Sequence, residues 1–525
     1  MQVPILYELF GEVSITQFLI LILLVLTVAY YVYATRHHGV WEKVGVPGPK
    51  PWPIIDHKIE LSKGVDVTFK KWFTLYGKTF GTYGILPHHA ALITKDLSLL
   101  KNILVKDFDN FVERNRPRKT TSSLRFGLTS SVGDRWRRTR HVTSPMFTGS
   151  RMKGILKHVC ASAETLTQLA KGHSDKGQLV ELKLFATKFA TEVIARIAFG
   201  VESHAVSKEE SEFSYYARTI IKFNNKFLGY VDRVYEYFPH IDPILRFFKV
   251  DIDFVSKTSD AYFSSVLEST IQERKNRSSQ SNEKPRDLLD MLLNARVDDN
   301  DPRLNDVDSK TLNHDEIIGN STMLILAGVE TVSTAFQSLL YCLALHSEIQ
   351  DKLIDEIDRV FPKGTTVDYE QLKELKYAEQ VIYECLRLFP LISTILRVAI
   401  DTKKYGNITI PKGTYVQIPI GDIMKDPEHW PDPDRFDPER FSPENKVGRD
   451  PLAFMPFGYG PRICLGMRLA MAELKVILVF LLRDFKFTLS ERTQPKKGEQ
   501  LVMKRFGVIA LRPAKAIELE VVPRG

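Results

Sequence analysis

The stretch PFGYGPRICLG, from Pro456 to Gly466, places a single cysteine on a loop that is rich in glycine and proline. Gly458 and Gly460 can adopt backbone conformations that other residues avoid, and they allow a large flat ligand to approach the main chain. Pro461 stiffens the turn that precedes Cys464. The stretch therefore predicts a rigid loop that presents one sulfur atom to a bound group.

The neighbours of Cys464 indicate that its sulfur binds a metal. Arg462 supplies a cation two residues before the cysteine, where it can meet a carboxylate. Gly466 precedes the apolar stretch MRLAMAELKVILVFLL, and the amides and dipole at the start of a helix there would favour the thiolate over the thiol. An ordinary buried cysteine is the alternative interpretation. Because Phe457, two glycines and an arginine share one run with the cysteine, we favour a haem iron ligand.

This loop resembles that of a known family. The pattern FGxGxRxCxG of the cytochrome P450 family, the haem-thiolate monooxygenases, is met at every specified position. WRRTRHVTSPMF, AGVETVSTAF and ECLRLFP extend the resemblance to the branch of microsomal animal enzymes that contains the vertebrate family-three drug-oxidising enzymes and thromboxane synthase. One departure is Asn115 in ERNRP, where that branch often has a basic residue. The resemblance implies a mainly α fold with small β-sheets, the cytochrome P450 fold, and haem b as the cofactor.

Residues for the haem propionates come from three segments. Trp136 and Arg140 lie four residues apart in an expected helix, so an indole N–H and a guanidinium share one face and can reach one carboxylate. Packing of the two side chains for stability alone is the alternative. The resemblance implies that this pair binds a propionate, as do Arg397 in ILRVA and Arg462. It also places Phe457 among the cofactor-binding residues.

A long apolar stretch from residue 312 to residue 345 predicts a helix that crosses the molecule, with AGVET in its middle. The Thr331 hydroxyl can bond back to the carbonyl of Ala327, which bends a helix and would open room for dioxygen. The resemblance implies that Glu330 and Thr331 form an acid-alcohol pair that delivers protons during oxygen reduction. A plain helix with a tolerated glycine and a solvent-facing acid is the structural alternative.

Two charged residues on an apolar helix predict a structural network. Glu384 and Arg387 lie three residues apart in VIYECLRLFP, and charges in so apolar a setting must pair. The resemblance adds Arg440, in PERF, as the third member of a network that fixes the cysteine loop. An exposed pair on a helix surface is the alternative.

The start of the chain predicts a membrane anchor. Residues 18–34 carry no charge, and with residues 15–17 they approach the roughly 20 residues that cross a bilayer. Glu8 and Glu12 precede this stretch where a cleaved signal peptide would have basic residues. Arg36, Lys43 and Lys50 follow it, so the positive-inside rule places the rest of the chain in the cytosol.

Three segments are therefore expected along the chain. Residues 1–35 form a luminal tip and a single-pass transmembrane anchor, and residues 36–53 form a hinge that ends in VPGPKPWP, whose prolines stiffen it. Residues 54–525 form the haem-binding domain. The apolar stretch from Tyr235 to Val250 either enters the membrane or packs in the core.

Composition agrees with such a protein. A chain of 525 residues with 44% hydrophobic content can bury a large core, and four cysteines are too few for a disulfide scaffold. The 72 basic residues exceed the 64 acidic ones, a net charge of +8. Because no basic stripe with interleaved aromatic residues accompanies this excess, we do not expect a nucleic-acid partner.

The predicted function is that of a haem-thiolate monooxygenase in the endoplasmic reticulum membrane. The resemblance implies insertion of one atom of O2 into an apolar xenobiotic, steroid or fatty acid, with electrons from NADPH-cytochrome reductase and with cytochrome b5 as a second partner. No nicotinamide or flavin motif occurs in this chain, so the reductase must be a separate protein. A haem-thiolate peroxide isomerase of the thromboxane-synthase type and a non-enzymatic membrane electron carrier are the alternatives.

Overall fold

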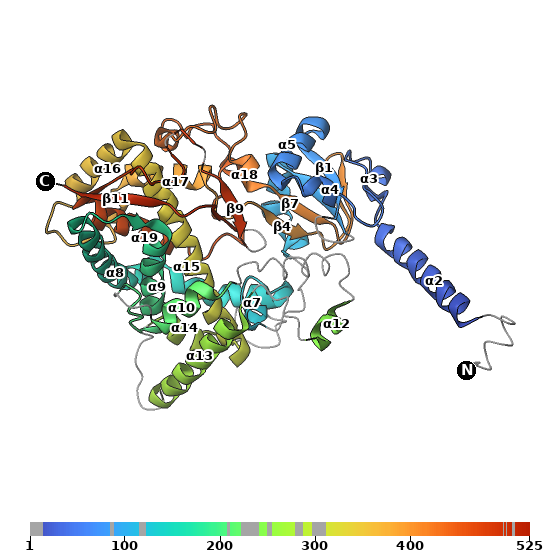
Figure 1. Cartoon of the computed structure of the whole chain (residues 1–525), viewed down its shortest axis with the longest axis horizontal. Helices are drawn as coiled ribbons and strands as arrows, with labels where there is room; N and C mark the ends of the chain where they lie inside the picture. The colour runs from blue at the N-terminus through green and yellow to red at the C-terminus, as the bar shows by residue number, and fades with distance from the viewer. Residues whose placement is uncertain are drawn as a thin grey trace. The chain divides into compact units, whose positions relative to one another are not determined.

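The computed structural model describes most of the chain, namely residues 14–84, 89–114, 122–206, 211–221, 241–248, 255–278, 287–296, 311–496, 498–499, 501–506 and 510–524. Helices make up most of the described residues, and the strands form small sheets (Figure 1). The predicted mainly α fold with small β-sheets is confirmed. The chain divides into a smaller unit of residues 1–99, 226–251 and 398–418, and a larger unit of residues 100–225, 252–397 and 419–525.

The smaller unit contains a sheet, a hairpin and short helices. Its helices are α2 (Ile15–Thr35), α3 (Val40–Lys43), α4 (Lys58–Leu61), α5 (Val65–Tyr76) and α12 (Asp242–Phe247). Its strands are β1 (Thr79–Tyr83), β2 (Ala90–Thr94), β5 (Lys403–Tyr405), β6 (Ile408–Ile410) and β7 (Tyr415–Ile418). The chain passes between the units within α6 (Leu97–Lys101) and β4 (Ile395–Val398).

One sheet organises the smaller unit. Strands β1 and β2 are antiparallel, with Phe80 opposite Ile93, while β7 runs parallel to β2 in the order β1-β2-β7-β4. Helix α5 packs on this sheet because Phe69 and Trp72 form one buried cluster with Phe80 and Ile93. Strands β6 and β7 are joined through a turn at Gly413, whose φ is +76°.

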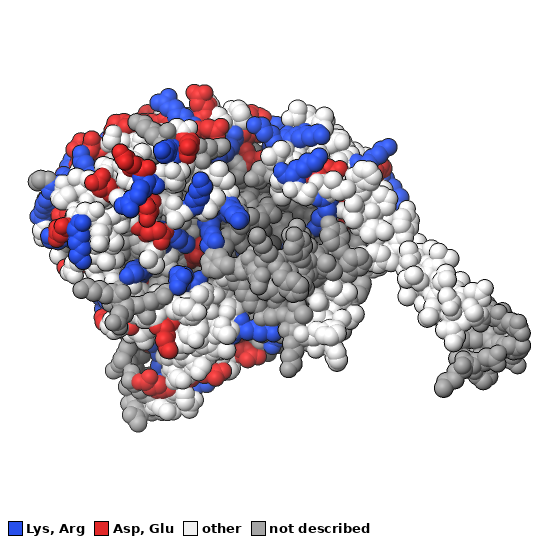
Figure 2. Space-filling view, in the orientation of Figure 1, with Lys and Arg blue, Asp and Glu red and all other residues white. Residues whose placement is uncertain are grey.

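Helix α2 has the properties predicted for the anchor. A capping box between Ser14 and Gln17 starts it, and its 21 residues include no charged side chain. It is long and apolar enough to cross a membrane, and it is exposed along nearly its whole length. In Figure 2 it forms an uncharged rod, whereas basic and acidic side chains are interspersed elsewhere on the face shown. An N-terminal apolar helix is therefore confirmed as the candidate membrane anchor.

The residues after α2 are packed against the sheet of the same unit. Trp41 is only 2% exposed, and its Nε1 donates to Thr82 O of β1 over 3.1 Å. The carbonyl of Pro47 accepts from Gly81 N over 2.8 Å. The proline-rich connector is thus bound to β1 by a backbone hydrogen bond, and the residues before it by the Trp41 side chain.

The larger unit is an assembly of helices with two small sheets. Its α-helices are α7 (Gly133–Thr143), α8 (Gly149–Asp175), α9 (Leu182–Phe199), α10 (Glu212–Thr219), α13 (Lys257–Ser278), α14 (Leu288–Leu293), α15 (His314–Leu345), α16 (Ser347–Val360), α17 (Lys376–Leu388), α18 (Ile420–Ile423) and α19 (Met467–Leu482). Its shorter helices are η1 (Asn102–Lys106), η2 (Phe108–Phe111), η3 (Ser123–Phe126), η4 (Ser144–Phe147), η7 (Gln371–Lys373), η8 (Pro438–Phe441) and η9 (Pro451–Ala453). Its strands are β3 (Val180–Glu181), β8 (Phe485–Thr488), β9 (Met503–Phe506), β10 (Ala510–Pro513) and β11 (Glu518–Pro523).

Helix α15 is the central element of the larger unit. A capping box between Asn313 and Glu316 starts it, close to the predicted residue 312, and it ends at the predicted Leu345. Its apolar side chains join those of α8, α9, α17 and α19 in one buried core. The helix is apolar enough to span a membrane, but most of it is buried, as a core helix should be.

Some expectations fall partly outside the described residues. These include Asn115 and the part of the stretch from Tyr235 to Val250 that flanks α12. In α12 itself, Ile244 is 57% and Phe247 is 80% exposed, which disfavours core packing of these two side chains.

Candidate functional site

The cysteine loop has the geometry that its glycines predict. Both Gly458 and Gly460 have a φ of +76°, in the left-handed region that favours glycine. A Cβ on Gly460 would lie 2.0 Å from Leu104 O, so no larger residue fits there. The amide of Cys464 donates to Phe457 O over 2.8 Å. These contacts fix the backbone that carries the cysteine.

Cys464 lies deep in the protein and yet is exposed. Its side chain is accessible, while burial raises the pKa of the thiol. An accessible side chain and a desolvated thiol are compatible if the sulfur faces an internal space that protein atoms surround. The amide of Gly466 lowers the same pKa, as predicted, and the charges of Arg140 and Arg114 lower it too, but desolvation outweighs them. The expectation that the start of the following helix favours the thiolate over the thiol is therefore wrong for the protein by itself, and a bound cation is needed to deprotonate the thiol.

Buried guanidinium groups gather near the cysteine. Arg397 is 1% and Arg462 is 3% exposed. Burial lowers the pKa of Arg397 well below the usual range, and the charges of Arg114 and Arg462 lower it further. Burial also lowers the pKa of Arg462 to about 9, again with help from Arg114 and from Arg140. Four cations therefore lie close enough to repel one another.

The described residues give this cluster no carboxylate in an ion pair, although the charge of Glu113 opposes the lowering of the Arg462 pKa. Among the residues that the structure describes, no carboxylate forms an ion pair with Arg114, Arg140, Arg397 or Arg462, and the Nε atoms of Arg114, Arg397 and Arg462 are buried without a hydrogen-bond partner. Buried charges are costly unless they are paired. The two propionates of a haem would supply these anions, and Cys464 would supply the iron ligand. The residues thus fit a haem.

Helix α7 brings the predicted Trp136 and Arg140 to this cluster. The guanidinium carbon of Arg462 lies 4.4 Å from the centre of the Trp136 ring, which also packs against Phe108. Arg462 Nη2 also donates to Ser131 O over 2.9 Å. Burial lowers the pKa of Arg140, and Cys464 opposes that change when it is ionised. The structure thus brings these predicted residues together.

Arg114 was missed by sequence reasoning. Its Nη2 donates to Arg462 O over 2.7 Å, and burial lowers its pKa. It lies next to Asn115, the position at which a basic residue was sought. Aligning the ERNRP segment with the family one position differently would have identified Arg114 as the basic residue.

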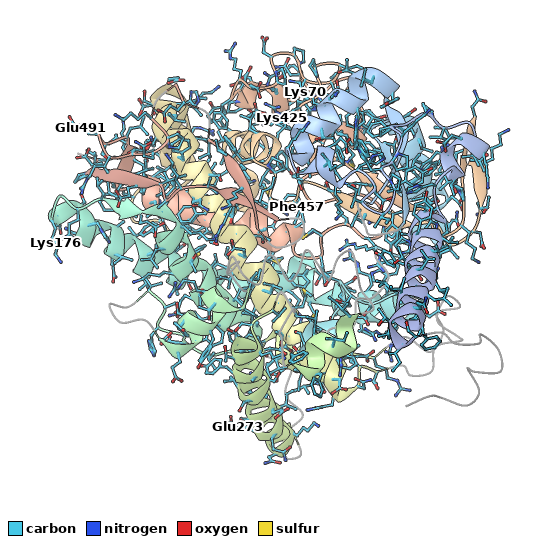
Figure 3. All side chains as sticks on the ribbon, turned by 45° about the vertical axis from the view of Figure 1, so that its right-hand side comes forward. Lys70, Lys176, Glu273, Lys425, Phe457 and Glu491 are labelled. Atoms are coloured by element: carbon cyan, nitrogen blue, oxygen red, sulfur yellow. The ribbon has the colours of Figure 1, made fainter. Side chains whose placement is uncertain are left out.

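Phe457 occupies the interior of the larger unit. Its half-buried side chain packs against the core, and Figure 3 shows it well inside this unit, whereas Lys176, Glu273 and Glu491 lie at the margins. Its carbonyl accepts from Cys464 N. Its observed role is therefore to hold the loop through both its side chain and its backbone.

The acid and the alcohol of α15 have different partners. Thr331 Oγ1 donates to Ala327 O over 2.6 Å, as predicted. Glu330 Oε1 instead accepts from Lys183 Nζ over 2.9 Å. Adjacent residues of a helix point about 100° apart. The described contacts include no hydrogen bond between Glu330 and Thr331, and Lys183 was not foreseen.

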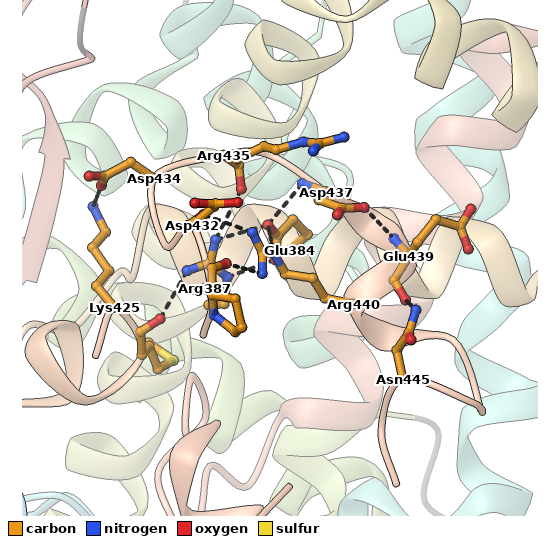
Figure 4. A network of polar contacts seen from close by, with 12 residues as sticks. Glu384, Arg387, Lys425, Asp432, Asp434, Arg435, Asp437, Glu439, Arg440 and Asn445 are labelled. Carbon is orange, nitrogen blue, oxygen red and sulfur yellow. Dashed lines mark hydrogen bonds and ion pairs between the residues drawn. The ribbon is translucent and has the colours of Figure 1, made fainter. Parts of the chain in front are cut away.

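The structural network forms around Glu384 (Figure 4). Arg387 donates to both carboxylate oxygens of Glu384, over 2.7 and 2.9 Å, and Arg440 Nε lies 3.4 Å from Oε1. Burial raises the pKa of Glu384, and the hydrogen bonds and charge of Arg387 oppose this rise. Asp437 N also donates to Glu384, and Arg387 Nη1 donates to Met424 O. The network therefore ties α17 to the segment that leads into the cysteine loop.

Comparison with known proteins agrees with this geometry. The family model for cytochrome P450 matches residues 46–516. Cytochrome P450 3A29 of Sus scrofa is 30% identical over 498 residues, which cover 95% of both chains. Cytochrome P450 3A41 of Mus musculus is 32% identical over 519 residues and 98% of both chains, and cytochrome P450 3A56 of Fundulus heteroclitus is 31% identical over 493 residues, 94% of this chain and 95% of the relative.

These matches span nearly the whole chain and confirm the family, the fold and the enzyme class that its motifs predict. The chain belongs to the cytochrome P450 family, the haem-thiolate monooxygenases.

Proposed function

We propose that this protein inserts one atom of O2 into an apolar organic substrate, with electrons that originate from NADPH and arrive through a separate reductase. The observation that carries the proposal is the exposed thiol of Cys464 beside four arginines that have no carboxylate partner among the described residues, of which Arg397 and Arg462 are buried and Arg114 and Arg140 half-buried. This arrangement suits a haem b with its propionates on the arginines. The bound haem would supply the centre for oxygen activation and accept electrons one at a time.

The residues divide the work of holding the cofactor. Cys464 would bind the iron. The propionates would be held by Arg140 and Trp136 of α7, together with Arg397 and Arg462. Arg114 joins this set on the basis of its burial and its bond to Arg462. The Glu384 network would keep the cysteine loop in position.

Glu330 and Thr331 would handle protons on the other face of the cofactor. Thr331 bonds back to the Ala327 carbonyl, and Ala327 is exposed although α15 is mostly buried. The hydrogen bond of Thr331 and the exposure of Ala327 together support an open space beside the middle of α15. Glu330 would bring protons from solvent and Thr331 would hold them near the reacting oxygen.

Apolar residues support an apolar substrate. Along α15, the half-buried side chains Met323, Leu324 and Leu326 precede Ala327, and Ile395 and Leu396 of β4 are half-buried as well. Such positions can contact a bound molecule by burying its apolar surface. A xenobiotic, a steroid or a fatty acid fits this description.

The anchor supports a location at a membrane. We assign residues 1–35 to the luminal tip and anchor, residues 36–53 to the hinge and residues 54–525 to the haem domain, on the cytosolic face of the endoplasmic reticulum. There the protein would meet lipid, NADPH-cytochrome reductase and cytochrome b5. The absence of a nicotinamide or flavin motif from the sequence supports a separate reductase.

The first test compares the parent with Cys464→Ala in membranes. We expect the reduced, carbon monoxide-treated parent to have a strongly red-shifted Soret band that the variant lacks, and we expect NADPH plus reductase to oxidise an apolar substrate. An unshifted band in haem-loaded parent would overturn the thiolate assignment. Turnover of an organic peroxide without any NADPH-driven oxidation would instead favour the isomerase alternative.

A further inference from the structure

Glu330 is held by a lysine from a different helix. Lys183, near the start of α9, donates from Nζ to Glu330 Oε1 over 2.9 Å, to Ser333 Oγ over 2.8 Å and to Thr334 Oγ1 over 3.3 Å. These acceptors share one face of α15 because they are three and four residues apart. The Thr331 hydroxyl donates to Ala327 O instead. The ammonium therefore holds the Glu330 carboxylate on the side of α15 that contacts α9.

The ion pair is largely shielded from water. The side chains of Lys183 and Glu330 are 23% and 22% exposed. Burial lowers the pKa of Lys183; the carboxylates of Glu330 and Glu181 oppose this change, and the charge of Arg512 adds to it. Arg512, on β10, also feels the charge of Glu330. Cations from α9 and from β10 thus both interact electrostatically with the carboxylate.

We propose that Lys183 is a positioning residue for the oxygen chemistry, because it holds the Glu330 carboxylate on the α9 side of α15, from where Glu330 delivers protons toward Thr331. This inference rests on the proton-delivery role proposed above for Glu330. Without Lys183, the charge of Arg512 still attracts the carboxylate and draws it toward β10. Each O2 then leaves with two electrons and two protons as hydrogen peroxide, and NADPH is consumed without product.

The test measures NADPH consumed, product formed and peroxide released by the full-length protein in membranes with reductase. Lys183→Met removes the charge and keeps the length of the side chain. We expect its peroxide yield per NADPH to rise about threefold or more, because the interaction energy between two contacting residues corresponds to a change of about this size. Lys183→Arg should stay near the parent because it keeps a cation and donors. Lys188→Met, on the same helix, is the matched control and should not change coupling.

The pH dependence separates positioning from a merely structural role. Only the charged ammonium holds the carboxylate, so coupling should be present below the pKa of Lys183 and fall as the pH rises through it. Because burial lowers that pKa, the fall should occur below the usual range of a lysine. Lys183→Arg should abolish the fall, since a guanidinium remains charged throughout that range.

Further variants distinguish the two proposals. If Glu330→Gln leaves coupling unchanged, the proton-delivery role fails, and the Lys183 proposal fails with it. If Glu330→Gln releases peroxide but Lys183→Met does not, the Lys183 proposal alone is overturned. The double variant should be no worse than Glu330→Gln, because Lys183 acts through Glu330. Should Lys183→Met not fold, Lys183→Gln keeps a hydrogen-bond donor without the charge and answers the same question.

Discussion

At the scale of single residues, the protein stores unfavourable electrostatics where its cofactor binds. Arg397 is buried beside Arg114 and Arg462, and the described residues offer it no carboxylate partner. Cys464 is a thiol that its surroundings do not deprotonate. Both costs are relieved by one ligand that brings two carboxylates and a metal ion. Haem binding and the stability of the folded chain are therefore coupled.

Replacing Arg397 by methionine tests this coupling. Arg397→Met keeps an unbranched side chain of similar length but removes a buried charge. We expect haem to leave about tenfold faster, since a hydrogen bond to a charged group contributes about 1.5–3 kcal/mol. We expect the haem-free protein to become more stable, because a buried unpaired charge is lost. Haem transfer to an excess of haem-free globin, and thermal unfolding of the haem-free variant, measure the two effects.

The exposed Arg435 supplies the control for this experiment. Arg435→Met should change neither haem loss nor the unfolding temperature, because the described contacts of Arg435 within the Glu384 network use its backbone carbonyl. If the haem-free Arg397→Met protein is less stable than the haem-free parent, the arginine cluster does not destabilise the empty site, and the coupling inferred from its burial is wrong.

At the scale of elements, the loop between η9 and α19 depends on one close backbone contact. Gly460 lies against the carbonyl of Leu104 in η1, whereas the nearest neighbour to a Cβ on Gly458 would be Ile395 Cδ1, at 3.7 Å. The two glycines share the same φ. They therefore separate the effect of steric contact from that of backbone strain.

Alanine at each glycine gives a matched pair of variants. Gly458→Ala adds the strain of a left-handed residue, about 1–2 kcal/mol, and we expect it to retain haem with moderately lower thermal stability. Gly460→Ala adds the same strain and a clash with backbone that cannot move aside, so we expect little or no thiolate-ligated haem. The carbon monoxide difference spectrum per milligram of purified protein measures the outcome. Equal loss in both variants would mean that the contact with Leu104 is unimportant.

The elements also show which features can be predicted from the sequence alone. The helix between residues 314 and 345, the bond from Thr331 to Ala327 and the pairing of Glu384 with Arg387 could be predicted because each depends on residues within one helix. The contact of Lys183 with Glu330 joins α9 to α15 across 147 positions of the chain. Local periodicity carries no information about such a pair. The same reason explains why Arg114, which meets Arg462, was missed.

At the scale of the whole molecule, the candidate membrane anchor is continuous with the folded part of the smaller unit. Helix α2 is exposed along most of its length, but Ala34, near its end, is 1% exposed and Trp41 is 2% exposed. The boundary between anchor and folded protein therefore lies close to Ala34. The predicted hinge of residues 36–53 contains side chains that belong to the core of its unit. Removing the anchor and removing the hinge should consequently have different effects.

Two truncations test where the anchor ends. A variant that begins at Ala34 lacks the apolar helix but keeps Trp41, whereas a variant that begins at Val46 lacks both. We expect both to lose resistance to carbonate extraction from membranes, because the segment that spans the bilayer is gone. Only the variant that begins at Val46 should also have a lower free energy of unfolding, by about 3–5 kcal/mol, since it loses a buried tryptophan that packs on β1. Loss of the Soret band on heating measures that stability, and equal unfolding temperatures for the two variants would show that residues 34–45 serve only as a tether.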